Sequence, residues 1–267
     1  MNAYFSIFRI RLITGIQYRI AAFAGIFTQF FWGFLFAMIY EAFYDNVTVV
    51  PPISLQQLIS YVWLQQAFLW LTILWMRDSQ IFNLITSGNI AYELCRPCAL
   101  YEFWYTKLVA QRLAAALLRC LPILVISFWL PLPYNLSLPA SFTALGLFMI
   151  TLALGLLVLV AVSMFIYISV FVTMSPAGSI MIFGIIGEFF SGGIVPIPLM
   201  PGWLQTVAYL LPFRLASDLP FRVYSGNIPV NEAITSIAVQ LIWLFVLVLA
   251  GKIALAKALN RVVVQGG

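Results

Sequence analysis

The chain has 267 residues, of which 64% are hydrophobic and 8% are charged. A soluble domain carries about 25% charged residues, so a soluble globule is excluded, and we expect a single all-α transmembrane domain over residues 1–267. The net charge of +5 indicates membrane topology rather than nucleic-acid binding, because the basic residues flank apolar runs.

Two kinds of chemistry lack their usual residues in this sequence. The absence of histidine removes the commonest general base and metal ligand, so we predict neither a catalytic nor a metal site. No Gly-x-x-x-x-Gly-Lys-Ser/Thr loop occurs either, since Gly251-Lys252-Ile253 lacks the first glycine and the hydroxyl. A nucleotide that drives this protein must therefore bind to another chain.

The apolar runs predict the membrane-embedded elements. Residues 1–18 are expected to form an amphipathic helix at the inner interface, because Phe5, Phe8, Leu12 and Ile16 share one helical face. Crossing a hydrocarbon core takes roughly 20 helical residues. Six runs meet that length and predict spans at about 20–43, 54–76, 108–130, 140–172, 176–195 and 232–256.

The longest polar stretch, 77–107, separates the second predicted span from the third. Its pattern predicts a helix to about Thr86, a break at Ser87-Gly88-Asn89, and a second helix up to Pro97.

The backbone is broken after the fifth predicted span. The apolar run ends at Ser191-Gly192-Gly193 and continues through prolines to Trp203. Such irregular backbone is tolerated at membrane depth only where protein or a water-filled cavity covers it. We therefore expect a special structure between the fifth and sixth spans.

The basic residues set the predicted orientation. With six spans, one side holds both termini and these residues: Arg9, Arg11, Arg19, Arg77, Arg96, Lys107, Arg112, Arg119, Lys252, Lys257 and Arg261. Only Arg214 and Arg222 fall on the other side. The positive-inside rule then places both termini in the cytosol and the chain, as a multi-pass protein, in the inner (plasma) membrane.

A few polar residues inside the spans are candidate functional residues. Glu188 is the one carboxylate placed inside a predicted span away from the ends, where burial costs at least ~2.5 kcal/mol. It either lines a transport pathway or pairs with an arginine such as Arg119 to hold helices together, and both interpretations stay open. Gln29 and Gln66 are interpreted as interhelical hydrogen-bonding residues, with a cavity lining as the alternative. Arg112 is expected to extend toward the inner headgroups.

The cysteines are interpreted as incidental. Cys95 and Cys98 form a Cys-x-x-Cys pair, which can indicate redox chemistry or half of a zinc site. The topology places this pair in the cytosol, where thiols stay reduced, and no further ligand cluster accompanies it.

Two motifs, in their order along the chain, resemble the permease subunit of ABC-2 type exporters. The first is the 189–213 stretch, from Phe189 through Ser191-Gly192 and the prolines to Leu211-Pro212-Phe213. The second is Gly88-Asn89-Ile90-Ala91-Tyr92-Glu93-Leu94-Cys95-Arg96-Pro97. With the interfacial helix and the six spans, the resemblance covers nearly the whole chain.

The resemblance implies a role for each motif. Within 77–107, the 77–97 part would be a coupling helix that docks on an ATPase, with these candidate residues: Arg77, Phe82, Leu84, Gly88, Glu93, Arg96 and Pro97. The 194–215 segment would form short re-entrant helices that cap the pathway. The candidate outer-gate residues are Ser191, Gly192, Gly193, Pro196, Pro198, Pro201 and Trp203.

The resemblance also implies partners and cargo. Two copies of a separate ATPase subunit, which would hold ATP and Mg²⁺, would drive a homodimer or heterodimer of permease subunits, and this chain itself would bind no cofactor. The cargo would be a hydrophobic or amphipathic drug, lipid, peptide or glycan, exported by alternating access.

An ion-coupled secondary carrier is the main alternative. Such carriers commonly show internal repeats and broken helices in both halves, whereas this sequence shows one broken element and no visible repeat. An intramembrane enzyme is disfavoured because His-Glu-x-x-His and Gly-x-Ser-x-Gly patterns are missing. A channel is disfavoured by the lack of charged rings.

Overall fold

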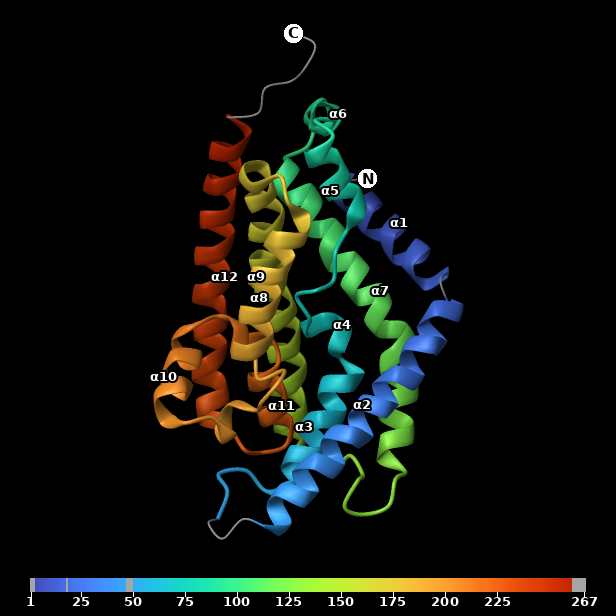
Figure 1. Ribbon diagram of the computed structural model, residues 1–267, viewed down its shortest axis with the longest axis vertical. Helices are drawn as coiled ribbons and strands as arrows, with labels where there is room; N and C mark the ends of the chain where they lie inside the picture. The colour runs from blue at the N-terminus through green and yellow to red at the C-terminus, as the bar shows by residue number, and fades with distance from the viewer. Residues whose placement is uncertain (1–2, 18, 47–49, 261–267) are drawn as a thin grey trace.

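The computed structural model describes residues 3–17, 19–46 and 50–260. Within these ranges the regular structure is entirely helical, as predicted, and the helices form an elongated bundle (Figure 1). Met1, Asn2 and Tyr18 of the predicted 1–18 helix lie outside the described residues, as does Arg261.

Among the described residues, four helices are long and apolar enough to cross a membrane. They are α2 (Arg19–Asp45), α7 (Leu100–Phe128), α8 (Phe142–Thr173) and α12 (Val230–Leu259). They correspond to the first, third, fourth and sixth predicted spans. α7 begins at Leu100 rather than near 108, because Leu100, Phe103 and Trp104 continue its buried face.

The second predicted span is interrupted rather than continuous. It consists of α3 (Leu55–Ala67) and α4 (Leu69–Thr72), which are separated at Phe68. The backbone then becomes extended at Ile73, directly after α4. The Ile73 carbonyl accepts a hydrogen bond from the Arg112 guanidinium of α7, at 2.5 Å. This bond supplies a partner for backbone that has left the helix, so the break needs no water at that point. Residues 54–76 therefore do not form one continuous helix, and the membrane crossing predicted for them stays a prediction.

The fifth predicted span is also short. α9 (Pro176–Phe190) has 15 residues and ends where Ser191 caps it and Gly192 takes a positive φ of 81°. The chain then forms short elements: η1 (Ile197–Leu199), α10 (Gly202–Leu210), η2 (Phe213–Ala216) and α11 (Asp218–Tyr224). The helical break is confirmed, but α9 stops before 195, and α11 lies beyond the predicted 194–215 segment.

The polar stretch contains the predicted helical hairpin. It consists of α5 (Ser79–Thr86) and α6 (Ile90–Leu94), separated by Gly88 at φ 75°. We call residues 79–94 the α5–α6 hairpin. Its second helix ends three residues before Pro97.

The N-terminal helix α1 (Ala3–Gln17) packs along the first half of α7. The Tyr4 hydroxyl accepts a hydrogen bond from the Ala99 N–H, at 3.1 Å. Further along, a Cβ on Gly15 would lie 2.5 Å from the Cβ of Ala114, so the two helices are in close contact. The helix is confirmed, and its position at the membrane interface stays a prediction.

The two ends of the bundle differ in what they carry. Figure 1 shows the start of α1, the α5–α6 hairpin and the end of α12 at one end, and the end of α2 and the start of α3 at the other. We call these the hairpin end and the opposite end. α10 and α11 lie beside the part of α12 nearer the opposite end (Figure 1). This arrangement groups the ends of the described chain with the hairpin, as predicted.

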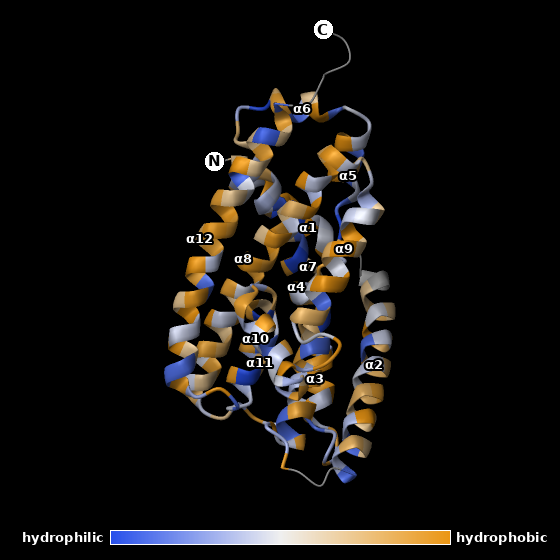
Figure 2. Ribbon diagram, turned by 60° about the vertical axis from the view of Figure 1, so that its left-hand side comes forward, coloured by the Kyte–Doolittle hydropathy of each residue, from blue (hydrophilic) through white to orange (hydrophobic). Residues whose placement is uncertain are grey.

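Burial is concentrated on α8. In its most apolar window 56% of α8 is buried, against 11% for α12, so α8 is central and α12 peripheral. Figure 2 shows α12 as largely hydrophobic, with hydrophilic residues at its first turns. An exposed apolar helix of this kind faces lipid or another subunit.

Candidate functional site

A buried carboxylate, Asp78, fixes the α5–α6 hairpin to the bundle. Its Oδ1 accepts hydrogen bonds from the backbone N–H groups of Gln80 (2.9 Å) and Ile81 (3.2 Å), so Asp78 is the N-cap of α5. Its own N–H donates to the Tyr167 hydroxyl of α8, at 2.8 Å. Asp78 is only 4% exposed, and it therefore joins the hairpin to the central helix.

Cations from two other helices lie beside Asp78. Lys107 Nζ of α7 is 3.0 Å from Asp78 Oδ2, and Arg11 Nη2 of α1 is 3.9 Å from the same atom. Both side chains also donate to Gln80 Oε1, Lys107 at 3.3 Å. α1, α5 and α7 thus meet at one carboxylate. The sequence placed these residues on the same side of the membrane but gave no sign that they meet.

Arg112 makes a second connection between the spans and the interrupted crossing. It is 2% exposed, and its guanidinium donates to the Ile73 carbonyl at 2.5 Å and to the Ser163 hydroxyl of α8 at 3.0 Å. The prediction that Arg112 extends to the headgroups is wrong, because the backbone that leaves α4 supplies a nearer acceptor.

Phe82 faces the bundle rather than the exterior. Its ring centroid lies 4.5 Å from that of Tyr167, and the residue is 5% exposed. The apolar side chains open to a partner are Tyr92 and Leu94, with exposed fractions of 74% and 45%. Phe82, named from sequence as a partner contact, therefore positions α5 instead, while Leu84 is half-buried.

The other predicted coupling residues lie in the hairpin or directly beside it in the chain, and all of them except the half-buried Glu93 are exposed. Glu93 and Arg96 form an ion pair at 3.0 Å. The Arg96 guanidinium also lies 5.1 Å from the Phe103 ring centroid of α7. The exposed positions that remain are Arg77, Gly88 and Pro97. Sequence did not identify Tyr92 and Leu94, since an apolar residue in a membrane chain carries no signal of its own.

The predicted outer break packs against α3. The Tyr61 hydroxyl donates to the Gly192 carbonyl at 3.1 Å, and Gln65 Nε2 donates to the Gly193 carbonyl at 2.8 Å. These bonds supply partners for carbonyls that have left α9. A Cβ on Gly192 would lie 2.5 Å from the Tyr61 hydroxyl oxygen. α3 therefore covers the break.

The predicted gate residues separate into a buried and an exposed group. Ser191 is buried, and its carbonyl accepts a hydrogen bond from the Ser217 hydroxyl at 2.7 Å. Pro196 and Pro198 are buried near it. Pro201 is exposed, and Trp203 is 71% exposed. Trp203 therefore lies on the outer surface of the segment and does not close it from within.

Glu188 lies where α9 meets the extended chain after α4. The Trp75 indole N–H donates to Glu188 Oε2. Glycines of α9 permit this contact, because a Cβ on Gly184 would lie 2.9 Å from the Trp75 ring and one on Gly187 would lie 2.1 Å from Leu74 Cδ1. The carboxylate is therefore held between α9 and the extended chain after α4.

The remaining predicted pathway residues join α2, α3, α4 and α7. Gln29 Nε2 of α2 donates to the backbone carbonyl of Gln66 in α3, at 2.9 Å, so the predicted interhelical bond is present. The Arg119 guanidinium carbon lies 4.1 Å from the Trp70 ring centroid. A Cβ on Gly25 would approach the same guanidinium at 3.1 Å, so α2 passes closely over it.

An ion pair at the opposite end was not predicted. Asp218, at the start of α11, is fully buried and pairs with Arg222 at 3.2 Å. Arg222 also donates to Asn227 Oδ1 at 2.7 Å and to the Tyr209 hydroxyl at 3.0 Å. Burial raises the pKa of the Asp218 carboxyl, and the charges of Arg222 and Arg214 oppose that rise. The signal in the sequence was that these two arginines are the exceptions to the positive-inside pattern.

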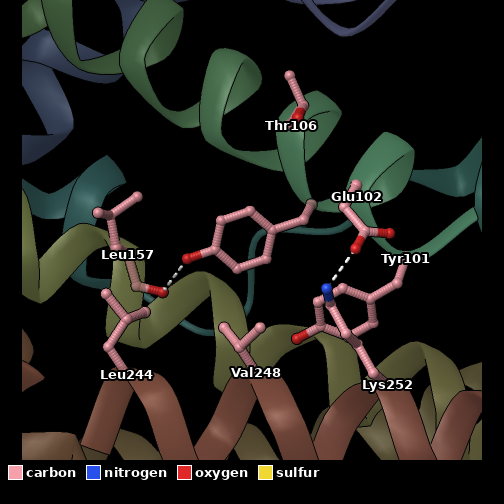
Figure 3. Close-up of a pocket in the computed structure, with 8 residues that line it drawn as sticks. Tyr101, Glu102, Thr106, Leu157, Leu244, Val248 and Lys252 are labelled. Carbon is pink, nitrogen blue, oxygen red and sulfur yellow. Dashed lines mark hydrogen bonds and ion pairs between the residues drawn. The ribbon is translucent and has the colours of Figure 1, made fainter. Parts of the chain in front are cut away.

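A groove opens between α7, α8 and α12 toward the hairpin end (Figure 3). Its volume is about 320 Å³. Leu244 and Val248 project into it from α12, and Lys252 forms an ion pair with Glu102 (Figure 3). The Tyr105 hydroxyl donates to the Leu157 carbonyl at 2.7 Å. The walls are therefore mainly apolar, with one ion pair at the end nearer the hairpin.

The described residues include no group of three or more histidine, cysteine or acidic residues placed to hold a metal ion. Cys95 is exposed, Cys98 is half-buried and Cys120 is buried, all as free thiols.

Comparison with known proteins found no match for this chain among protein-family models, curated proteins or solved structures. The resemblance described above therefore stands on the residues of the chain alone.

Proposed function

We propose that this chain is the permease subunit of an ATP-driven exporter of the ABC-2 type, in the inner membrane with both termini in the cytosol. The observation that carries the proposal is the anchored α5–α6 hairpin. Asp78 ties the hairpin to α1, α7 and α8, and Arg112 ties the chain that leads into it to α7 and α8. A force applied to the hairpin would reach two spanning helices directly.

The exposed part of the hairpin is the proposed docking surface for a separate ATPase subunit. Tyr92 and Leu94 offer apolar contact area, and Arg96 offers a charge beside them. Aromatic and arginine residues are the types that contribute most at protein interfaces. ATP and Mg²⁺ would bind to the partner, and a second permease subunit, the same or a different chain, would complete the exporter.

The two interrupted crossings complete the proposed six-pass topology. α3–α4 with the extended chain to Asp78 forms the second pass, and α9 with the 191–216 segment forms the fifth. The bonds from Tyr61 and Gln65 to the Gly192 and Gly193 carbonyls hold these passes together on the outer side. Separation of this contact is the proposed opening step of the outer gate.

The groove of Figure 3 supports the hydrophobic or amphipathic cargo class. It opens on the apolar face of α12, and its one ion pair is close to the cytosolic end. An apolar molecule with a polar group at one end matches that arrangement. A hydrophobic or amphipathic drug, lipid, peptide or glycan is therefore the proposed cargo.

The docking proposal is tested by purification and reconstitution with a candidate ATPase subunit. Replacing Tyr92 and Leu94 together by alanine should abolish co-purification and remove the stimulation of ATP hydrolysis by the permease, because it removes the exposed apolar contacts. The matched control is Val172→Ala, an exposed apolar residue at the same end of the bundle, which should change neither. Full co-purification by the double variant would contradict docking at the hairpin.

One observation favours the alternative, an ion-coupled secondary carrier. The helical segments α3–α4 and α9 are both interrupted, with Glu188 between them, whereas the sequence predicted one such break. If both segments cross the membrane, as proposed, the paired breaks are typical of carriers. The two mechanisms separate in energised vesicles. An exporter should lose transport when ATP is depleted and keep it when ionophores collapse the ion gradients. A carrier should do the reverse, and Glu188→Gln should then abolish its gradient-driven transport.

A further inference from the structure

A polar pocket lies at the opposite end from the hairpin, where α10 and η2 face the first turns of α12. Its volume is about 410 Å³. It is lined by Tyr209, Arg214, Ile228, Asn231, Glu232, Thr235, Ser236 and Val239. Figure 2 shows the same place as the hydrophilic first turns of α12. Tyr209 and Arg214 belong to the 191–216 segment, but the pocket contains none of the hairpin residues, none of the candidate gate residues between Ser191 and Trp203, and none of the residues that line the groove of Figure 3.

Arg214 is a buried cation that faces this pocket. It is 7% exposed, and its guanidinium carbon lies 4.1 Å from the Tyr209 ring centroid. It makes no hydrogen bond and no ion pair with the residues that the structure describes, and its Nε is fully buried. The nearby Asp218 carboxylate is paired with Arg222 and attracts Arg214 electrostatically, but it accepts no hydrogen bond from the Arg214 guanidinium. A buried guanidinium whose N–H groups lack an acceptor is costly, so the electrostatics of the pocket favour the binding of an anion.

The start of α12 adds a second feature that favours an anion. α12 is 30 residues long, and its N-cap, Pro229, provides no side-chain hydrogen bond to the first turn. The free N–H groups and the helix dipole at such a terminus favour negative charge. The Asn231 amide and the Ser236 hydroxyl line the same pocket as further donors. Glu232 is exposed on the first turn, and it is the one acidic residue of the lining, so its charge opposes the binding of an anion.

We propose that this pocket binds a phosphate-type oxyanion, held between the Arg214 guanidinium and the first turn of α12. A guanidinium fits a phosphate through two parallel hydrogen bonds. The oxyanion is either the phosphate of a lipid headgroup or a free phosphate group. A lipid has access because Val239 of α12 lines the pocket, and Ile242, one helical turn further along the same face, is a 62% exposed apolar side chain.

The test measures binding to the purified full chain without ATP or a partner, so its outcome is separate from that of the docking experiment. Native mass spectrometry measures retention of phosphatidylglycerol against diacylglycerol with the same acyl chains, and thermal unfolding measures stabilisation by inorganic phosphate. The wild type should retain phosphatidylglycerol preferentially if lipid is the source. Stabilisation by inorganic phosphate alone would identify a free phosphate group as the source.

Variants of the two charged residues connect either result to the pocket. Arg214→Gln should lower oxyanion affinity roughly tenfold or more, because charge-assisted hydrogen bonds are lost. Arg214→Lys keeps the positive charge and the aliphatic side chain but loses the planar guanidinium, so its oxyanion affinity should lie between those of the wild type and Arg214→Gln. Binding by this variant would show that the loss in Arg214→Gln does not come from a folding defect. The matched control Glu232→Gln removes the opposing charge on an exposed turn and should raise affinity about two- to fivefold. Equal binding by wild type and both arginine variants, or no phosphate-dependent binding at all, would overturn the proposal.

Discussion

At Gly192, backbone conformation and packing both require glycine. Its φ of 81° disfavours any side chain, and a Cβ there would lie 2.5 Å from the Tyr61 hydroxyl oxygen. We expect Gly192→Ala to lower the free energy of unfolding by about 2 kcal/mol, since the left-handed conformation costs roughly 1 kcal/mol and the Tyr61 hydrogen bond is displaced. Thermal unfolding in detergent measures the change.

A second glycine in the same segment provides the control. A Cβ on Gly202, at the first position of α10, has no atom within 4 Å among the described contacts. Gly202→Ala should therefore be neutral or slightly stabilising, because alanine favours the helix by up to about 1 kcal/mol. Equal stability of the two alanine variants would show that Gly192 does not need to be glycine.

At the scale of elements, the Asp78–Lys107 pair is expected to hold α5 on the bundle. Asp78→Asn keeps an N-cap side chain but leaves Lys107 buried without its partner, which costs about 3 kcal/mol or more. Adding Lys107→Met removes that unpaired charge, so the double variant should recover part of the loss. Denaturant unfolding of the wild type, Asp78→Asn, Lys107→Met and the double variant measures the coupling free energy between the two side chains, expected at about 1–3 kcal/mol. Strictly additive losses would contradict it.

The sequence could predict the helical hairpin and the outer break because local residues cause both. Gly88 and Gly192 adopt positive φ angles, and prolines follow the second break. The break in α3–α4 could not be predicted in this way. Residues 54–76 contain no glycine or proline. The hydrogen-bond donor that replaces the helical partner of the Ile73 carbonyl is Arg112, 39 residues away along the chain. Hydropathy measures apolar content, which is the same for a continuous and an interrupted crossing.

In the candidate sites, too, the sequence could predict what local residues cause but could not predict contacts between distant residues. Glu188 stood out in the sequence as a carboxylate in an apolar run, but its partner Trp75 is 113 residues away. Phe82 and Leu94 are both apolar residues of the hairpin, and only the packing on Tyr167 shows which one faces inward. Composition therefore identified segments and isolated charges, while the contacts between interrupted crossings depend on tertiary packing.

At the scale of the whole molecule, the six-pass topology predicts which positions face each side of the membrane. Cys95 and Met174 lie at the hairpin end, and Val50 and Trp129 lie beside connections at the opposite end; the exposed fractions of Met174, Val50 and Trp129 are 55%, 91% and 82%. A membrane-impermeant maleimide reports the side of each. Single cysteines are introduced at the other three positions after Cys95, Cys98 and Cys120 are replaced by serine.

Cys95 and the variant Met174→Cys should react with the maleimide only in inside-out vesicles, because both termini and the hairpin are proposed to be cytosolic. Val50→Cys and Trp129→Cys should react only on intact cells. The comparison of Val50→Cys with Cys95 is decisive for the proposed second pass. Four elements separate the two positions: α3 and α4, which with the extended chain to Asp78 form that pass, and the short helices α5 and α6 of the hairpin. If Val50→Cys and Cys95 react on the same side, the chain between them does not cross the membrane. The proposal of an outer Val50 together with a hairpin that docks on a cytosolic ATPase would then be wrong.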